Sequence, residues 1–285
     1  MQREEERQVV IGMVKYINTA PIHEKWKETV HCERWRMVEA APATLNRMLS
    51  EGSIDLGFVS CFEYAANPDD YQILAGLSIS ANGPVGSVFL FSHLPMERLD
   101  GQPVLLTSQS QTSVSLVKII LEDFHKVRPR YASGDILSAE EGGYQAVLAI
   151  GDDALRLVDS SRYLYQFDLG DIWKRHTGLP FVFAVCAVRN DFVRSHPEEL
   201  AAIHGELLRC RDEGKADLAE ICRVAALRIP MSEKKCYDYL TAIEYDLSAA
   251  KRKALENFIT LLAGRGEAPP HALPLKIVPC PRRAE

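Results

Sequence analysis

The side chains of this sequence that could do chemistry are neutral hydrogen-bonding groups rather than strong acids or bases. Asn18 follows the apolar run Val9–Ile11 and precedes Pro21, and its amide can both donate and accept a hydrogen bond. Ser87 stands directly after a polar stretch that contains Gly83 and Gly86, where a second apolar run begins. From these stretches alone, Asn18 is better explained as a helix cap, and Ser87 by itself is a weak indication of a site.

A hydroxyl-rich loop is the third candidate. Every residue of Thr107–Ser113 is Ser, Thr or Gln, and an apolar stripe at helical spacing follows. The start of a helix offers free backbone N–H groups and a partial positive charge, so Ser110, Thr112 and Ser113 would suit a carboxylate or a phosphate. Because the loop carries neither a P-loop lysine nor a G-x-G-x-x-G pattern, an organic carboxylate is the preferred ligand and a nucleotide is not.

Two further positions have competing explanations. Ser60 ends the apolar run Ile54–Val59, on the same predicted sheet edge as Asn18, and a ligand contact and a turn hydroxyl explain it about equally well. Gly151 and the acidic pair Asp152–Asp153 follow another apolar run, and the pair favours a helix cap over a catalytic dyad.

Composition excludes several classes of protein. The chain has 285 residues, a hydrophobic share of 47%, a charged share of 25% and a formal charge of -6, which fits a globular protein and not a nucleic-acid binder. No apolar stretch approaches the roughly 20 residues that span a bilayer, and we expect that the mixed-charge start is no export signal. The cysteines form no CxxC pair and the histidines no metal-ligand spacing, so we expect reduced thiols, no bound metal and a cytoplasmic location.

The elements that must position these residues alternate between strand and helix. Strand–helix–strand patterns fill the first sixty residues, and a second set begins at Pro103, which predicts parallel sheets in an α/β protein. In such sheets, ligands gather at the carboxyl ends of the strands. From Pro197 onward the pattern is helix after helix, in which we find no chemistry, and the tail from Pro269 is expected to be extended and loosely held.

Five motifs carry a resemblance to a known family. In chain order they are Val14–Pro21, Gly83–Val88, Ser110–Ser113, Ala149–Leu155 and Thr177–Ala184. Together they resemble the chorismate dehydratases of the futalosine route to menaquinone, over most of the chain from about Val9 to the helices past Arg189.

The resemblance implies a two-lobed fold of the periplasmic-binding-protein type II class, with a ligand cleft between the lobes and extra C-terminal helices. We expect lobe 1 to comprise residues 1–88 and 185–285, and lobe 2 residues 89–184. The implied reaction converts chorismate to 3-[(1-carboxyvinyl)oxy]benzoate and water, with no metal or organic cofactor. The only partner expected is the small-molecule substrate, with no nucleic acid and no membrane; no oligomeric state is predicted.

The resemblance also implies roles for particular residues. Asn18 and Ser87 match the family's active-site positions, and its hydroxyl-rich ligand loop corresponds to Ser110, Thr112 and Ser113. The remaining expected substrate contacts are Ser60, Gly86, Gly151 and Asp152. No motif position holds an obvious Glu or His base, so we hypothesise that the substrate's own side-chain carboxylate accepts the proton.

Two alternatives stay open. One is the paralogous 1,4-dihydroxy-6-naphthoate synthase of the same pathway, which shares the scaffold; the segments Gly83–Ser87 and Thr177–Ala184 favour the dehydratase. The other is a non-catalytic solute-binding protein for an aromatic carboxylate, against which the missing export signal counts.

Overall fold

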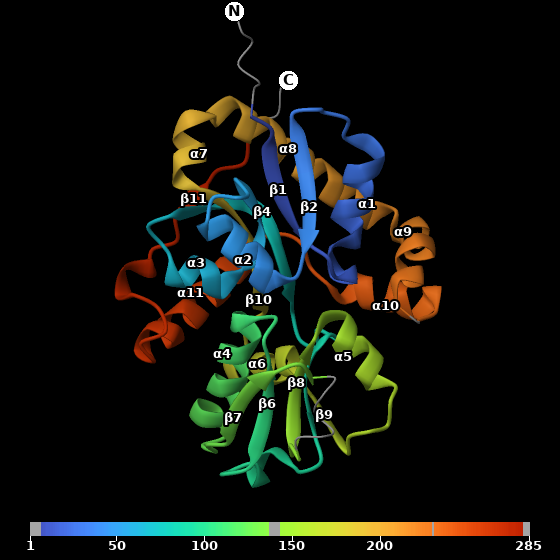
Figure 1. Ribbon diagram of the computed structural model, residues 1–285, viewed down its shortest axis with the longest axis vertical. Coiled ribbons are helices and arrows are strands. Elements are labelled where there is room, and N and C mark those ends of the chain that lie inside the picture. Colours follow the sequence, from blue (N-terminus) through green and yellow to red (C-terminus); the bar gives the residue numbers. More distant parts are fainter. Residues whose placement is uncertain (1–6, 137–142, 230, 282–285) are drawn as a thin grey trace, which may run out of the picture.

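The computed structural model has two lobes, each built around its own β-sheet (Figure 1). It describes residues 7–136, 143–229 and 231–281, so the mixed-charge start at residues 1–6 lies outside the described part. We call the lobe with the six-stranded sheet the large lobe and the lobe with the five-stranded sheet the small lobe. The predicted α/β class and two-lobed architecture are confirmed.

The large-lobe sheet has the strand order β11-β4-β10-β3-β1-β2. Its strands are β1(Val9–Val14), β2(Trp35–Ala40), β3(Leu56–Ser60), β4(Tyr71–Ala81), β10(Phe181–Arg189) and β11(Ile277–Val278). As the strand–helix–strand patterns predicted, β1 pairs in parallel with both β2 and β3. Strand β10 runs antiparallel between β3 and β4, so a segment from late in the chain joins the two parts of this sheet.

Helices surround the large-lobe sheet. They are α1(Ala20–Thr29), α2(Pro42–Ser50), α3(Cys61–Ala66), α7(Asn190–Ser195), α8(Pro197–Ala216), α9(Leu218–Ala225), α10(Glu233–Ala242) and α11(Ala249–Gly264), with the short 3-10 turns η1(Ile17–Thr19), η5(Ala226–Arg228) and η6(Pro270–Ala272). Among the described helices, none is both long enough and apolar enough to cross a membrane.

The small-lobe sheet has the order β7-β6-β8-β5-β9. Its strands are β5(Val88–Ser92), β6(Pro103–Thr107), β7(Arg130–Gly134), β8(Ala146–Ile150) and β9(Tyr165–Asp168). Its helical segments are η2(Met96–Arg98), α4(Gln111–Lys118) continuing into the π-helical turn η3(Ile119–Phe124), α5(Gly151–Val158) and α6(Leu169–Thr177). Figure 1 shows α4 and α5 at the end of this lobe that faces the large lobe.

The chain crosses between the sheets twice, at residues 82–87 and 178–180. The first crossing lies at the expected boundary near residue 88. The second differs from the expected boundary after residue 184, because Phe181, Val182 and Ala184 pair with β4 in the large-lobe sheet. The whole apolar run of β10 therefore belongs to the large lobe, since its inter-strand hydrogen bonds need a continuous partner.

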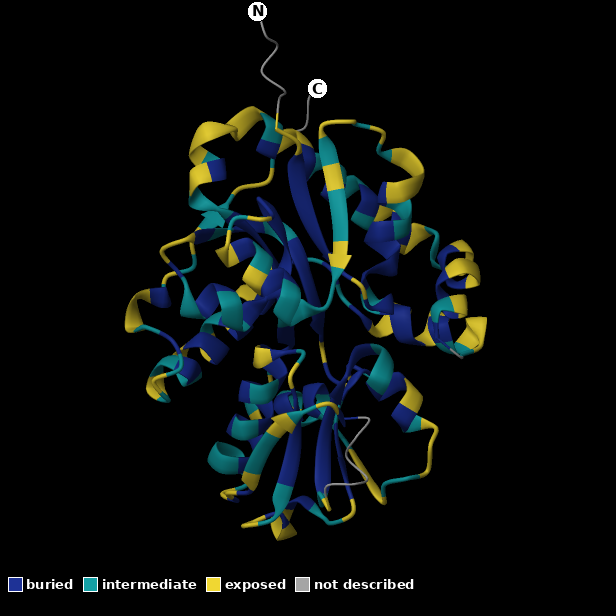
Figure 2. Cartoon of the chain, in the orientation of Figure 1, coloured by how far each residue is buried: buried dark blue, intermediate teal, exposed yellow. Residues whose placement is uncertain are grey.

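Buried strands form the centre of each lobe (Figure 2). Every residue of β1, β3 and β8 is buried, which explains their unbroken apolar sequences. In the large lobe, Gly12 of β1 lies opposite Gly57 of β3. A Cβ on Gly57 would lie 2.5 Å from the Gly12 carbonyl oxygen, so this close approach of the strands requires glycine.

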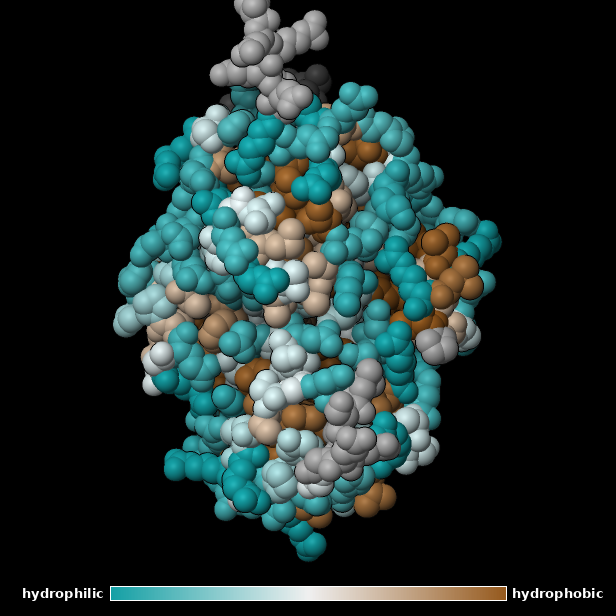
Figure 3. Space-filling model, viewed as in Figure 1, coloured by the Kyte–Doolittle hydropathy of each residue, from teal (hydrophilic) through white to brown (hydrophobic). Residues whose placement is uncertain are grey.

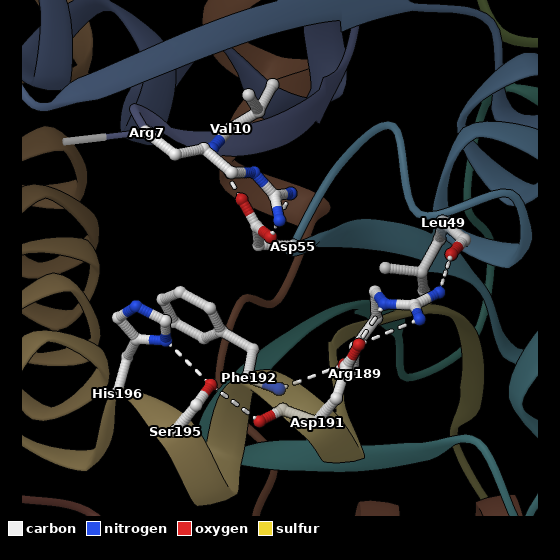
Figure 4. A network of polar contacts seen from close by, with 9 residues as sticks. All are labelled: Arg7, Val10, Leu49, Asp55, Arg189, Asp191, Phe192, Ser195 and His196. Atoms are coloured by element: carbon white, nitrogen blue, oxygen red, sulfur yellow. Dashed lines mark hydrogen bonds and ion pairs between the residues drawn. The ribbon is translucent and has the colours of Figure 1, made fainter. Parts of the chain in front are cut away.

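A polar network fixes the strand ends farthest from the small lobe (Figure 4). The Asp55 carboxylate, before β3, accepts from the Val10 backbone N–H at 2.8 Å and from the Arg7 side chain at 2.7 Å. The backbone N–H of Arg189, at the end of β10, donates to the Asp55 carbonyl at 3.0 Å, and its guanidinium donates to the Leu49 carbonyl at 3.0 Å. The network aligns three strands whose opposite ends face the other lobe.

Removing the Asp55 carboxylate should destabilise the large lobe. The side chain is 6% exposed, so Asp55→Ala leaves the buried Val10 N–H without a partner, and we expect a loss of about 1–3 kcal/mol in the free energy of unfolding. Arg7→Ala is the control, because the Arg7 side chain is 71% exposed and should contribute at most about 1 kcal/mol. Urea denaturation of both variants tests this; equal losses would contradict it.

The C-terminal tail is tied to the sheet, which corrects the expectation of a loose end. Strand β11 pairs in parallel with β4, and the Lys276 backbone N–H donates to the Tyr64 hydroxyl at 2.8 Å. No sequence pattern indicated β11, because a two-residue edge strand is too short to show one.

The surface of the large lobe is apolar beside α9 and α10 (Figure 3). Leu227 is 86% exposed, and Val224 and Tyr237 are also exposed there. Tyr239, two positions after Tyr237, is buried on the opposite side of α10. This helix therefore has one face toward solvent and one toward the interior, between the sheet and the small lobe.

Candidate active site

A cavity, partly open to solvent, lies between the lobes. Of the predicted site residues, Asn18, Ser60, Ser87, Ser110, Ser113 and Gly151 line it. The other lining residues are mostly apolar: Val14, Tyr16, Pro42, Ile79, Val85, Val88, Ile150, Phe183 and Ala184. Segments far apart in the sequence thus place neutral polar groups around one apolar space, the usual composition of a small-molecule site.

The side chain of Asn18 has an unused hydrogen-bond acceptor. Its amide oxygen is buried and has no partner among the described residues. Asn18 lies in the turn η1, which is held by the Thr19 hydroxyl donating to the Val14 carbonyl at 2.6 Å and to the Tyr16 carbonyl at 2.9 Å. A buried polar atom without a partner is costly, so this oxygen is expected to meet a donor on a ligand or a water molecule.

Neither of the two predicted helix caps forms. The residue that caps α1 is Thr19, not Asn18, and no side-chain capping bond is made there. At α5 the capping position is Ile150, and Asp152 and Asp153 lie inside the first turn. The capping explanations were therefore wrong, because in both cases the helix begins one or more positions away from where the polar residue suggested.

Ser87 is held from both lobes. Its carbonyl accepts from the Gly151 backbone N–H at 2.7 Å, and its hydroxyl accepts from the Tyr239 hydroxyl at 2.8 Å. The preceding loop is fixed by the Asp168 carboxylate, which accepts from the backbone N–H groups of Val85 at 3.0 Å and Gly86 at 2.7 Å. Burial raises the pKa of the Asp168 carboxyl, while these backbone donors oppose that rise.

Tyr16 connects the lobes at the cavity wall. Its hydroxyl donates to the side chain of Gln109, whose amide in turn donates to Asp153 at 3.3 Å. The Tyr16 ring packs on Gly151, which has φ +56° and whose Cβ, if it had one, would lie 2.8 Å from that ring. Both the backbone conformation and the contact require glycine at position 151.

The hydroxyls of Ser60 and Ser113 in the lining keep their own hydrogens available. Ser60 accepts from the Asn46 amide at 2.9 Å and from the Glu63 backbone N–H at 3.2 Å, capping α3. Ser113 accepts from the Ser110 hydroxyl at 3.2 Å. Since a hydroxyl has one hydrogen and two lone pairs, each of these groups can still donate into the cavity.

Three predicted contacts lie outside the lining and stay predictions. Thr112 points away from the cavity, and its hydroxyl accepts from the Phe62 backbone N–H at 3.0 Å. Gly86 has φ +72° and lies against the Tyr239 ring. The Asp152 carboxylate accepts from the Ile17 backbone N–H at 3.3 Å, and burial raises its pKa. These residues support the lining from behind.

The cavity suits an anion held by neutral donors at the starts of α2 and α4, whereas Asp152 and Asp153 offset the partial positive charge at the start of α5. None of the described residues that line it carries a charged side chain. The first turns of α2, α4 and α5 reach it through Pro42, Ser113 and Gly151. Helix starts carry partial positive charge, so they stabilise a carboxylate where the net charge of -6 does not. Elsewhere in the described residues, no group of three His, Cys, Asp or Glu side chains could hold a metal ion.

Sequence reasoning missed Tyr239, Tyr16 and Asp168. Tyr239 looked like one more apolar position of a core helix, although a buried tyrosine hydroxyl usually has a partner. Tyr16 lies inside the motif Val14–Pro21, in which only Asn18 was expected to have a role. Asp168 occurs in an irregular aromatic stretch, and only its capping bonds to Gly170 and Asp171 could have been anticipated from the helix that follows.

A family model described as menaquinone biosynthesis matches residues 9–264. The chain belongs to this menaquinone biosynthesis family. A Thermus thermophilus protein named chorismate dehydratase is 32% identical over 275 residues, which cover 90% of this chain and 96% of that protein. A protein of the same name from Campylobacter jejuni is 29% identical over 182 residues, covering 62% of this chain and 66% of that protein.

Solved structures place this family member in the periplasmic-binding-protein fold. A crystal structure of an Archaeoglobus fulgidus protein has a TM-score of 0.73 at 18% identity and covers 93% of this chain and 99% of that one. An alkanesulfonate-binding protein from Xanthomonas axonopodis pv. citri, bound to MOPS, has a TM-score of 0.68 at 18% identity, covering 97% and 100%. The resemblance drawn from the motifs is thereby confirmed for family and fold.

Proposed function

We propose that this protein is a chorismate dehydratase, a hydro-lyase that converts chorismate to 3-[(1-carboxyvinyl)oxy]benzoate and water. The observation that carries the proposal is a cavity of neutral donors with one buried, unpartnered acceptor on Asn18. Chorismate has two carboxylates that need donors and a ring hydroxyl that can donate to that acceptor. The name of the Thermus thermophilus relative, aligned over 90% of this chain, supports the same activity.

The proposed reaction needs orientation more than strong acid–base groups. A proton leaves the ring carbon that bears the ether. Its electron pair forms the third ring double bond, and the C–O bond to the ring hydroxyl on the adjacent carbon breaks. The departing hydroxyl takes up a proton and leaves as water, and aromatisation makes the step downhill. The enzyme therefore has to fix the substrate and stabilise the departing oxygen.

We assign the catalytic positions to Asn18 and Ser87. The Asn18 amide oxygen holds the ring hydroxyl, and the Ser87 hydroxyl donates toward the departing oxygen or the enolpyruvyl group. We assign the substrate contacts to the lining residues Ser60, Ser110, Ser113 and Gly151 and to the residues that support them, Gly86, Thr112 and Asp152. Since the described residues of the lining offer no carboxylate or imidazole, the enolpyruvyl carboxylate of the substrate is the proposed base.

We also propose a cytoplasmic location, which the state of the cysteines supports. All seven are free, and five of them are buried: Cys61, Cys186, Cys210, Cys222 and Cys236. Burial raises the pKa of the Cys61 thiol to about 12, which keeps it protonated and unreactive at neutral pH.

Incubation of the purified protein with chorismate tests the function directly. We expect an aromatic product to appear in the ultraviolet spectrum, with the mass of 3-[(1-carboxyvinyl)oxy]benzoate and without added metal or cofactor. A protein that binds chorismate tightly but forms no product would instead be a solute-binding protein. Conversion of a cyclised futalosine derivative, with chorismate left unchanged, would indicate the naphthoate synthase.

A further inference from the structure

The structure ties Ser87 to a residue outside the cavity, Tyr239 of α10. The two are 152 positions apart in the chain, and the Tyr239 hydroxyl donates to the Ser87 hydroxyl oxygen at 2.8 Å. Tyr239 is 7% exposed and Ser87 2% exposed, so water does not compete for this bond. Tyr239 does not itself line the cavity.

We propose that Tyr239 is a positioning residue, which holds the Ser87 hydroxyl as a donor toward the substrate. This proposal deepens the proposed function and rests on it. A serine hydroxyl rotates freely in solution, and its hydrogen can point along any of three staggered directions. When one lone pair accepts from Tyr239, the hydrogen must point elsewhere, and no described protein group accepts it.

The surroundings leave Ser87 little other freedom. The Ser87 carbonyl is held by Gly151, and the loop before it is held by the backbone N–H groups of Val85 and Gly86, which donate to the Asp168 carboxylate. That carboxylate is itself fixed as the cap of α6 by the backbone N–H groups of Gly170 and Asp171. The Tyr239 ring also packs on Gly86, where a Cβ would lie 3.4 Å from the ring. With the backbone fixed, the remaining variable is the direction of the hydroxyl hydrogen, and Tyr239 sets it.

Tyr239 is suited to remain the donor. Burial raises the pKa of its phenol, so the hydroxyl keeps its proton at neutral pH. A chain of two hydroxyls also polarises the second one, which makes the Ser87 hydrogen a better donor to a departing oxygen. Tyr239 itself touches no reacting atom and acts only through Ser87.

The chain supplies a matched control. Tyr245 is likewise fully buried in the C-terminal segment, but its hydroxyl has no hydrogen-bond partner among the described residues. Tyr239→Phe and Tyr245→Phe therefore delete the same atom from two buried rings, and only the first deletion removes a bond to Ser87.

Steady-state kinetics with chorismate test the proposal. We expect Tyr239→Phe to lower kcat about tenfold with KM changed less than about threefold, and Tyr245→Phe to leave both unchanged. Ser87→Ala should lower kcat by about 10²- to 10³-fold. In the Ser87→Ala background, adding Tyr239→Phe should have no further effect on kcat, because Tyr239 then has no hydroxyl to orient.

Two outcomes would overturn the positioning role. One is an equal kcat loss from Tyr239→Phe with and without Ser87→Ala; the other is an equal loss from the two tyrosine variants. A wild-type protein that fails to dehydrate chorismate overturns the proposed function instead. The hydrogen bond between Tyr239 and Ser87 is then tested by urea denaturation. Tyr239→Phe should shift the unfolding midpoint less in the Ser87→Ala background than in the wild-type background. An equal shift in both backgrounds would also count against the proposal.

Discussion

An Asn18→Asp variant should fold normally and lose about 10³-fold in kcat/KM for chorismate. The exchange is isosteric, and the Asn18 amide oxygen has no described protein partner to lose. The new carboxylate would face a dianionic substrate in a cavity without cationic side chains, close to Asp152, which bonds the adjacent Ile17. Such a like-charge contact costs several kcal/mol, which corresponds to this loss in rate.

Gln102→Glu is the matched control for Asn18→Asp. It makes the same amide-to-carboxylate exchange at the end of β6 that is farthest from the cavity, and it should keep wild-type kinetics. Burial also raises the pKa of a carboxyl at position 18, so the variant should regain activity relative to wild type as the pH falls. A fully active Asn18→Asp variant at neutral pH would remove Asn18 from the substrate contacts.

A chorismate analogue whose side-chain carboxylate is replaced by a carboxamide should bind but not be dehydrated. If that carboxylate is the base, its loss removes a contribution of about 10²- to 10⁴-fold to kcat. The described cavity lining has no carboxylate or imidazole that could take over the proton. Aromatic product formation, followed by ultraviolet absorbance, measures kcat, and calorimetry measures binding.

The analogue with the ring carboxylate converted to a carboxamide is the control for this test. It loses one of the two anionic groups as well, but it keeps the proposed base, so we expect weaker binding with kcat largely retained. Turnover of the side-chain carboxamide at the normal rate would end the idea that the substrate supplies its own base.

Much of the fold and part of the site follow from local sequence. Asn18, Ser60 and Ser110 come shortly after apolar strand runs, and the carboxyl ends of such strands meet at the ligand edge of a sheet. The structure places all three at one cavity, together with Ser87 after its glycine-rich loop. Their position at strand ends could be predicted because a strand and its following turn are set by neighbours only a few positions apart.

Within the ligand loop, only the structure distinguishes Thr112 from Ser113. Both are hydroxyl residues in the first turn of α4, and the sequence treats them alike. Successive residues of a helix point about 100° apart, so Ser113 faces the cavity while Thr112 accepts from Phe62 of the other lobe. The rotation of α4 about its axis depends on packing against the large lobe, which no local pattern encodes.

The contacts of Tyr239 and Asp168 likewise depend on tertiary packing. Local patterns predicted the α/β sheets and polar groups at their edges, and the five motifs implied two lobes and a site of neutral donors. The sequence could not place a buried tyrosine of α10 against a serine 152 positions earlier, or bring the backbone N–H groups of Val85 and Gly86 to the Asp168 carboxylate. Those arrangements exist only once the lobes pack together, because the partners are brought close by the fold and not by their spacing along the chain.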